Sequence, residues 1–234
     1  MAILERLLDF FYPRFCICCK QPIHLPTQGY LCDRCFNQIV FNHTTCCTCC
    51  GRAMGAQEGT VCQNCAELQP YFHKGISLFA FNDVGRHFIH TLKYHNGLFL
   101  KKDLQKLLSN EKEKLLIWED PCFVPVPLHF MRQWKRGYNQ SAIICQALQR
   151  ICGGKITPIL KRKINTPSQT SLTRKERKLN VKGAFMLNAK TIDENKTYVL
   201  VDDVFTTGAT LNECASVLQQ HGAKDIRVFT LAHG

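Results

Sequence analysis

Residues 198–210 read Tyr-Val-Leu-Val-Asp-Asp-Val-Phe-Thr-Thr-Gly-Ala-Thr, and this stretch decides the fold. The mostly apolar run at 198–201 predicts a buried strand of a parallel sheet. Residues 211–220 have helical spacing, so a short loop rich in hydroxyl groups joins the strand to a helix. Backbone N–H groups and the helix dipole favour an anion at such a loop, and Gly208 lets the backbone approach it closely. The stretch therefore predicts a strand–loop–helix unit that binds phosphate.

Two adjacent acids, Asp202 and Asp203, follow the predicted strand directly. Their carboxylates can accept hydrogen bonds from sugar hydroxyls, while Thr206, Thr207 and Thr210 can donate to a phosphate. These groups together suit a ribose 5-phosphate. A Walker loop is excluded because no Gly-Lys-Ser/Thr ending is present, and a dinucleotide fingerprint is excluded because the loop has one glycine. The plainer alternative, in which the acids only cap the helix, remains open.

The stretch at 199–210 resembles the signature of type I phosphoribosyltransferases. The resemblance implies that the acid pair contacts the ribose hydroxyls of phosphoribosyl pyrophosphate (PRPP), and that the loop holds its 5-phosphate. The residues assigned in this way are Asp202, Asp203, Thr206, Thr207, Gly208, Ala209 and Thr210. The signature identifies a binding site, and the sequence assigns no catalytic residue.

Four cysteine pairs of the form Cys-x-x-Cys occupy the first part of the chain, separated by 12, 11 and 11 residues. They are Cys16 with Cys19, Cys32 with Cys35, Cys47 with Cys50, and Cys62 with Cys65. Two such pairs close a tetrahedral thiolate site, so we expect one or two structural zinc ions. An iron–sulfur cluster is the main alternative.

The choice of cysteine ligands and their pairing order stay open in the sequence. Cys46 with Cys49 is an alternative pair, although Gly51 favours Cys47 with Cys50 because a glycine eases the turn around a metal-bound sulfur. Consecutive pairs can share an ion, which the shorter loops favour, or the pairs can interleave. We expect residues 1–70 to form an N-terminal helix with a zinc module, and residues 71–234 to form a second domain.

Composition and charge narrow the class of protein. Of the 234 residues, 45% are apolar and 21% charged, which is ordinary for a globular chain. Residues 1–15 are apolar but carry Glu5, Arg6 and Asp9, so they read as a helix packed on its own protein rather than a secretory signal or a membrane anchor. Residues 71–234 hold the entire net charge of +12. That charge favours a polyanion, although a solvated basic loop remains the alternative.

Alternating strands and helices predict an α/β fold with a mostly parallel sheet flanked by helices. The strands are expected at 75–81, 122–126, 155–160, 198–201 and 225–231, and the helices at 84–95, 98–116, 141–151 and 211–220. A loop rich in cations should follow the strand at 122–126. The phosphoribosyltransferase resemblance implies that its Lys135, Arg136 and Gly137 hold pyrophosphate, with an exposed basic loop as the alternative. Residues 162–185 read as a long mobile loop carrying Gln169, Arg174 and Arg177.

The whole chain resembles the ComF family of competence-associated phosphoribosyltransferase-like proteins. The resemblance rests on the cysteine pairs, on Leu92-Lys93-Tyr94, on Val124-Pro125-Val126-Pro127-Leu128, and on Arg136-Gly137-Tyr138-Asn139-Gln140, in addition to the signature. It implies a cytoplasmic protein, with peripheral inner-membrane association open, that serves uptake of single-stranded DNA in natural transformation. It also implies a helicase-like competence partner.

Three functions remain in competition. The first is a PRPP-binding competence protein that also binds single-stranded DNA. For this function Phe130, Trp134 and Tyr138 either stack on bases or pack in the core, and the sequence slightly favours packing. The second is an active phosphoribosyltransferase of nucleotide salvage, using Mg²⁺ with PRPP. The third is a zinc scaffold whose transferase domain is vestigial.

Overall fold

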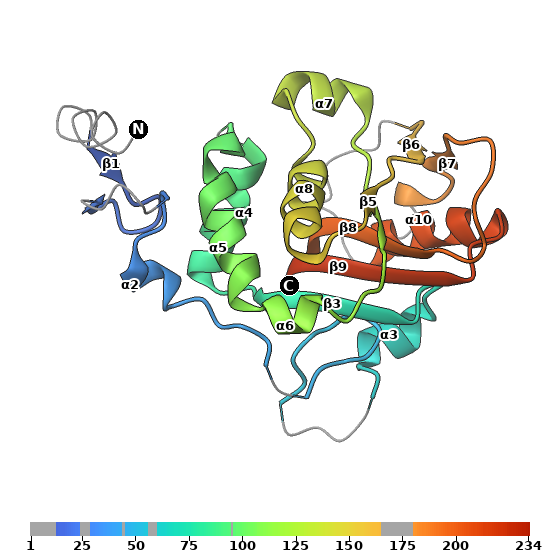
Figure 1. Ribbon diagram of the computed structural model, residues 1–234, viewed down its shortest axis with the longest axis horizontal. Helices are drawn as coiled ribbons and strands as arrows, with labels where there is room; N and C mark the ends of the chain where they lie inside the picture. The colour runs from blue at the N-terminus through green and yellow to red at the C-terminus, as the bar shows by residue number, and fades with distance from the viewer. Residues whose placement is uncertain (1–12, 24–28, 44, 56–59, 95, 165–179) are drawn as a thin grey trace.

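A five-stranded parallel sheet forms the centre of the computed structural model, which describes residues 13–23, 29–43, 45–55, 60–94, 96–164 and 180–234 (Figure 1). The strand order is β3-β9-β8-β4-β5, and every pairing in this sheet is parallel. The predicted α/β class with a mostly parallel sheet is confirmed.

The predicted helix near the N-terminus and the residues Gln169, Arg174 and Arg177 lie outside the described residues.

Nine strands are described. They are β1 (Arg14–Phe15), β2 (Pro22–Ile23), β3 (Lys74–Ala80), β4 (Cys122–Pro125), β5 (Lys155–Ile156), β6 (Leu160–Arg162), β7 (Phe185–Leu187), β8 (Thr197–Phe205) and β9 (Asp225–His233). The pairs β1–β2 and β6–β7 form two small antiparallel sheets of their own.

The described helices are mostly short. They are α2 (Asp33–Phe36), α3 (Gln63–Leu68), α4 (Asp83–Tyr94), the 3-10 helix η1 (Gly97–Leu100), α5 (Lys101–Asn110), α6 (Lys112–Leu115), α7 (Phe130–Arg136), α8 (Gln140–Cys152) and α10 (Ala209–Gln220).

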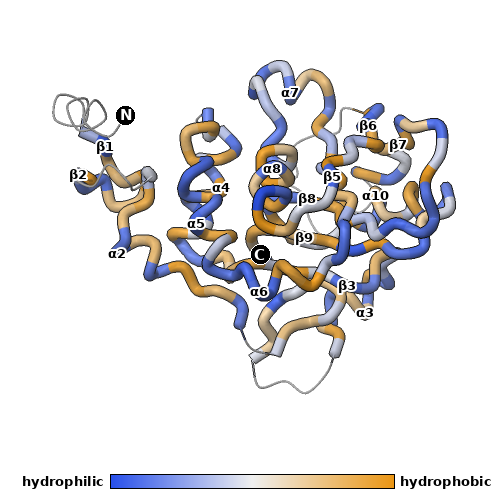
Figure 2. The backbone as a smooth tube through the Cα atoms, in the orientation of Figure 1, coloured by the Kyte–Doolittle hydropathy of each residue, from blue (hydrophilic) through white to orange (hydrophobic). Residues whose placement is uncertain are grey.

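The two faces of the sheet are packed by different helices. Successive residues of β8 point to opposite faces, so Val199 and Val201 join one core while Tyr198 and Leu200 join the other. The first core includes apolar residues of α4, α5 and α8, and the second includes those of α10. Hydrophobic residues accordingly dominate β8 and β9 in Figure 2. Burial on both faces explains why these strands read as continuous apolar runs.

Strand β8 is longer than the sequence indicates. The prediction ended it at residue 201 and placed the acids after it, but β8 continues to Phe205 because β9 pairs with it up to His233. On its other side β4 ends at Pro125, which pairs with Val201. Asp202 and Asp203 therefore lie within the strand, where only one edge is still hydrogen-bonded.

Three further predicted elements differ in the structure. The helix expected at 98–116 is divided into η1, α5 and α6, because Glu111 between the last two has a non-helical backbone (φ −113°, ψ 27°). The strand expected at 155–160 is divided into β5 and β6, with Pro158 between them. The cation-rich loop expected after β4 contains a helix, α7, which Gly137 ends with a positive φ of 78°.

The cysteine-rich segment passes around the β3 edge of the sheet. Cys16 and Cys35 belong to the core that contains α4, α5 and α8, whereas Cys50 and Cys65 belong to the core that contains α10. Between them, the Val40 carbonyl accepts a hydrogen bond of 2.8 Å from the Ala80 N–H. The two halves of the segment therefore contact opposite faces of the sheet, and the proposed division into two domains at residue 70 stays a prediction.

One buried carboxylate attaches the first half of this segment to α5. Asp103 accepts hydrogen bonds from the backbone N–H of Tyr30 (2.8 Å) and of Leu31 (2.9 Å). A Cβ at Gly29 would lie 2.2 Å from the Asp103 carboxylate, so only glycine fits there. Burial raises the pKa of Asp103, and the two N–H donors oppose that effect.

Replacing Asp103 with Ala should lower the free energy of unfolding by about 2–3 kcal/mol, because two buried N–H groups lose their acceptor. Chemical denaturation measures the change. Lys106→Ala is the matched control on the same helix: it removes an exposed ion pair to Asp33 (2.7 Å) and should cost less than about 0.5 kcal/mol. Equal losses for the two variants would contradict the assigned role of Asp103.

Candidate functional site

A cleft of about 370 Å³ opens at the carboxyl ends of β4 and β8. Ligands of open α/β sheets bind at this edge. Its lining comes from the end of β8 with the following loop, the segment after β4, the end of α4, the helices α7 and α8, Arg162 of β6, and Phe81 after β3. Asp202, Asp203 and all of residues 206–210 line it, as does Arg136. Lys135 and Gly137 are exposed and do not line it.

The two acids have different surroundings. Asp203 is buried, and its Oδ1 lies 3.0 Å from the Lys93 Nζ. Among the described residues, its Oδ2 has no hydrogen-bond partner. Asp202 is partly exposed to the cleft, and its Oδ1 accepts hydrogen bonds from Ser141 Oγ (3.1 Å) and from the Asp203 N–H (2.9 Å). A buried carboxylate oxygen without a donor marks a place where a hydroxyl of a ligand can donate.

The acid pair carries less negative charge than two free carboxylates. Burial raises the pKa of Asp202 to about 7, and the negative charge of Asp203 adds to this rise. Lys93 acts in the opposite direction. Burial lowers the pKa of Lys93, but the charges of Asp203 and Asp202 outweigh it, so the net shift is upward and the ammonium stays protonated. Lys93 thus compensates part of the pair's charge.

The loop at 206–210 has the geometry of an anion site. Gly208 has a φ of 75°, and a Cβ there would lie 2.5 Å from the Phe205 ring, so this position requires glycine. Helix α10 begins at the next residue, and the Ala209 N–H donates to Thr207 Oγ1 (3.3 Å). The first three residues of this twelve-residue helix, 209–211, line the cleft, and the first-turn N–H groups of a helix favour an anion. The helix starts two residues earlier than the sequence indicates.

Cationic side chains also line the cleft. Within the described part of the chain these are Lys93, Arg132, Arg136 and Arg162. Arg136 donates to Gln140 Oε1 (2.7 Å), and its guanidinium lies 4.9 Å from the centre of the Tyr94 ring. Arg162 is buried, and burial together with the charge of Arg132 lowers its pKa. Several positive groups held close together favour a ligand with more than one phosphate.

Sequence reasoning missed four residues in or beside the cleft as site residues. Lys93 and Tyr94 entered only through a family motif, because a lysine in the last turn of an amphipathic helix is usually solvated. Arg162 lay in a basic stretch that read as a loop, whereas it ends β6. Ser141 carried no signal at all, since its contact with Asp202 spans 61 positions in the chain.

The eight predicted cysteine ligands gather into two groups. Cys16, Cys19, Cys32 and Cys35 form the first cluster, and Cys47, Cys50, Cys62 and Cys65 form the second. In each cluster the sulfur atoms lie within 4.8 Å of one another. Consecutive pairs therefore share a site, as expected, and Cys46 and Cys49 belong to neither cluster.

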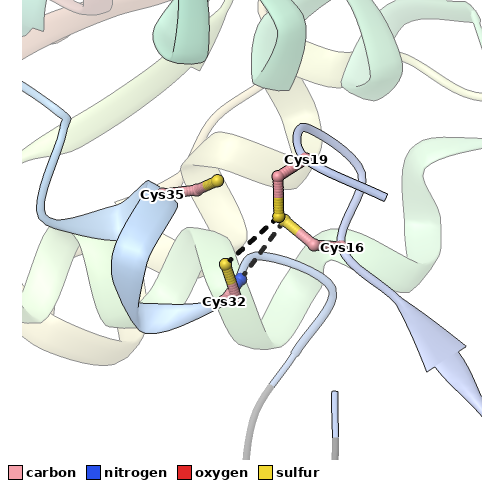
Figure 3. A group of neighbouring side chains, drawn as sticks. All are labelled: Cys16, Cys19, Cys32 and Cys35. Atoms are coloured by element: carbon pink, nitrogen blue, oxygen red, sulfur yellow. Dashed lines mark hydrogen bonds between the residues drawn. The ribbon is translucent and has the colours of Figure 1, made fainter. Parts of the chain in front are cut away.

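The sulfur geometry of both clusters fits zinc. Zn–S bonds of about 2.3 Å at tetrahedral angles place sulfur atoms about 3.8 Å apart. The Sγ atoms of Cys19 and Cys32 are 3.7 Å apart, and those of Cys50 and Cys62 are 3.8 Å apart. The Cys32 N–H points at Cys16 Sγ (3.5 Å), as Figure 3 shows, and the Cys62 N–H points at Cys47 Sγ (3.3 Å). Such N–H groups stabilise thiolates, the form that binds zinc.

Two family models match the chain. The double zinc ribbon domain matches residues 7–66, and the phosphoribosyl transferase domain matches residues 136–234. Competence protein F of Haemophilus influenzae is 33% identical over 234 residues, which cover 97% of this chain and 99% of that protein. The chain belongs to the ComF family. The predicted phosphoribosyltransferase-like fold with an N-terminal zinc module is confirmed, and structural zinc is supported at two sites of four cysteines each.

Two further relatives match over most of their length. DNA utilization protein YhgH of Salmonella typhimurium is 30% identical, with 94% of this chain and 96% of that protein covered. Competence protein ComFC of Streptococcus pneumoniae is 29% identical, with 78% and 79% covered. A hypoxanthine phosphoribosyltransferase structure from Staphylococcus aureus aligns at 15% identity over 57% of this chain and 64% of that one, with a TM-score of 0.35. The fold assignment rests on the family model and the sheet order instead. No helix in the described residues is long and apolar enough to cross a membrane.

Asp202 should make stability depend on pH. Its pKa is raised in the folded protein, so its stabilising contribution is complete below about pH 4 and is lost as the pH rises towards 7. The free energy of unfolding of Asp202→Asn should therefore rise by about 1–2 kcal/mol relative to wild type as the pH is raised from 4 to 8. This value is smaller than the full pKa shift implies, because solvent in the cleft screens the charge. Urea unfolding at several pH values measures the difference.

Asp225→Asn provides the control with the opposite sign. Burial raises the pKa of Asp225, but hydrogen bonds from Arg227 and Thr197 outweigh it and lower the pKa overall. This carboxylate stabilises the protein above about pH 4, so the variant should lose stability relative to wild type at neutral pH. If the free energies of unfolding of both variants changed with pH in the same direction relative to wild type, the raised pKa of Asp202 would be contradicted.

Proposed function

We propose that the cleft binds PRPP and that the protein serves DNA handling in competence. One observation carries the ligand assignment: the acid pair on β8 precedes a glycine-containing loop at a helix N-terminus, and both line one cleft together with four cationic side chains. A sugar that bears phosphate on one side and diphosphate on the other matches this order of groups.

Each part of PRPP has a partner in this arrangement. Residues 206–210 bind the 5-phosphate through N–H groups and threonine hydroxyls. Asp202 and Asp203 accept hydrogen bonds from the ribose hydroxyls, and the unpartnered Oδ2 of Asp203 supports this role. Arg136, with Arg132 and Arg162, binds the diphosphate. Mg²⁺, when bound, would add positive charge that offsets the charge of the diphosphate.

The proposed pyrophosphate site differs from the one expected from the sequence in two of its three residues. Arg136 keeps its role, whereas Lys135 and Gly137 lie outside the cleft lining. The roles of Gln169, Arg174 and Arg177 remain a proposal for residues beyond the described part of the chain. Closure of that segment over PRPP would exclude water.

Binding rather than transfer is the activity that we propose. Ligand groups for the sugar and its phosphates are accounted for, but no described residue is assigned to an acceptor base. An active phosphoribosyltransferase is the alternative, and pyrophosphate release in the presence of PRPP, Mg²⁺ and a panel of nucleobases would reveal it.

Helix α7 supports a role with single-stranded DNA. Its Phe130 is 70% exposed and its Trp134 is 88% exposed, so the packing favoured by the sequence is wrong for these two, while Tyr138 is buried. The exposed Lys135 shares the helix with these aromatic groups, and α7 stands clear of the sheet in Figure 1. Exposed rings next to cations suit stacked bases and a phosphate backbone. Relatives named as competence and DNA utilization proteins agree with this role.

Uptake of single-stranded DNA at the inner membrane, together with a helicase-like competence protein, completes the proposal. It places the protein in the cytoplasm, with peripheral membrane association left as part of the hypothesis. The family resemblance supports these finer statements.

Replacing both Asp202 and Asp203 with Asn should weaken PRPP binding by at least about 100-fold, because both acceptors for the ribose hydroxyls are lost. Calorimetric titration with and without Mg²⁺ measures the affinity. Asp225→Asn, at the far end of the same sheet, is the control and should bind normally. Wild-type affinity in the double variant, with a normal melting curve, would rule out this site.

Trp134→Ala should weaken binding of an oligothymidylate by about 5–20-fold, because one stacked base contributes roughly 1–3 kcal/mol. Lys135→Ala should instead reduce the slope of log affinity against log salt by about one. Fluorescence anisotropy measures both effects. Phe15→Ala removes another exposed aromatic ring, in β1, and should change neither. An unchanged affinity in Trp134→Ala would remove α7 from the DNA site.

A further inference from the structure

The second cysteine cluster lies directly next to the phosphate loop. Cys62 precedes α3, Cys65 lies in it, and the helix ends at Leu68. A Cβ placed on Gly208 would lie 2.8 Å from Leu68 Cδ2, so the leucine side chain occupies the space beside this glycine. The helix that contains Cys65 and begins directly after Cys62 therefore touches the loop assigned to the 5-phosphate.

Two more contacts connect the residues after α3 to the same loop. The Tyr71 N–H donates to Asn212 Oδ1 (2.8 Å) in the first turn of α10. The ring of Phe72 packs edge-on against Phe205, with 6.2 Å between centroids. Phe205 precedes the loop, so the loop is supported at both of its ends by residues that follow the second cluster.

The remaining side of Phe205 is also fixed. His233 stacks on the Phe205 ring with centroids 4.9 Å apart and an angle of 19° between the planes. The Gly234 N–H donates to the Phe205 carbonyl (2.9 Å). Phe205 therefore lies between the end of β9 and Phe72, and it leaves the phosphate loop little freedom as long as α3 is in place.

The first cluster has different neighbours. Its half of the ribbon contacts α5 through Asp103 and η1 through the Tyr30 and Phe99 rings, whose centroids are 4.6 Å apart. None of its described cysteines belongs to the core that contains Phe205 and α10. The two clusters are chemically alike but occupy different surroundings.

We infer that the second cysteine cluster, with its zinc, fixes the phosphate loop, and that Leu68 is the positioning residue that transmits this support. The inference rests on the proposed function for the loop's role in binding PRPP. The metal holds α3 because its ligands at 62 and 65 converge only in the folded ribbon. Loss of the second zinc releases α3, whereas loss of the first leaves the loop unchanged.

The coupling acts in both directions. If zinc in the second cluster raises the affinity for PRPP, PRPP must raise the affinity of that cluster for zinc by the same factor. Saturating PRPP should therefore raise the chelator concentration needed to remove one of the two zinc ions at equilibrium and leave that for the other unchanged.

Leu68→Ala tests the positioning role without removing a zinc ligand. Hydrogen exchange at residues 206–210 should rise by about tenfold, and PRPP affinity should fall by about fivefold, while two zinc ions remain bound. Leu68→Met should restore both values. Tyr30→Ala, which removes a half-buried contact in the first half of the ribbon, is the matched control and should change neither value at these residues.

Cys65→Ser and Cys35→Ser compare the two clusters, each variant being expected to lose one zinc. Only Cys65→Ser should raise exchange at residues 206–210 and weaken PRPP binding. Equal effects in both variants, or unchanged exchange in Leu68→Ala, would overturn the inference. Hydrogen exchange is measured without ligand, so it tests the support of the loop independently of PRPP binding. Failure of the proposed function would appear instead as a wild-type protein that does not bind PRPP.

Discussion

Beyond Val201, strand β8 has a hydrogen-bonded neighbour on one side only. Strand β9 pairs with it as far as Phe205, while β4 stops at Pro125. This difference in length opens the sheet at the position where two carboxylates occur in the sequence. The cleft, the buried Asp203 and the loop that follows all depend on it, because a longer β4 would cover the acids with another strand.

Charge balance within the cleft follows from the same geometry. Two acids side by side in a partly buried strand repel each other, and burial raises the cost of their charge. Lys93 offsets part of that cost from the last turn of α4, on the face of the sheet opposite α10. The cleft thus presents a partly compensated acid pair next to several arginines, which favours a ligand that carries both hydroxyls and phosphates.

The cysteine-rich segment packs against the phosphoribosyltransferase-like part of the chain and contributes to both of its cores. It passes around the β3 edge of the sheet, so one half contacts the helices of the first core and the other half contacts the phosphate loop. A region of this size has little core of its own, and metal ligation compensates for that. Placing one metal cluster on each face lets a small module fix two distant elements of the larger fold.

The sequence by itself determined the class of fold, the presence of a zinc module built on Cys-x-x-Cys pairs, and the stretch that forms the candidate loop, whereas the structure decided which pairs share a site. Those signals are local: an apolar run, a Cys-x-x-Cys spacing, and acids next to threonines and a glycine. Only the tertiary structure decided that Lys93, Ser141 and Arg162 join the acid pair, that Trp134 faces solvent, and that Leu68 supports Gly208. These contacts join residues far apart in the chain, and their formation depends on which strand pairs with which and where each one ends.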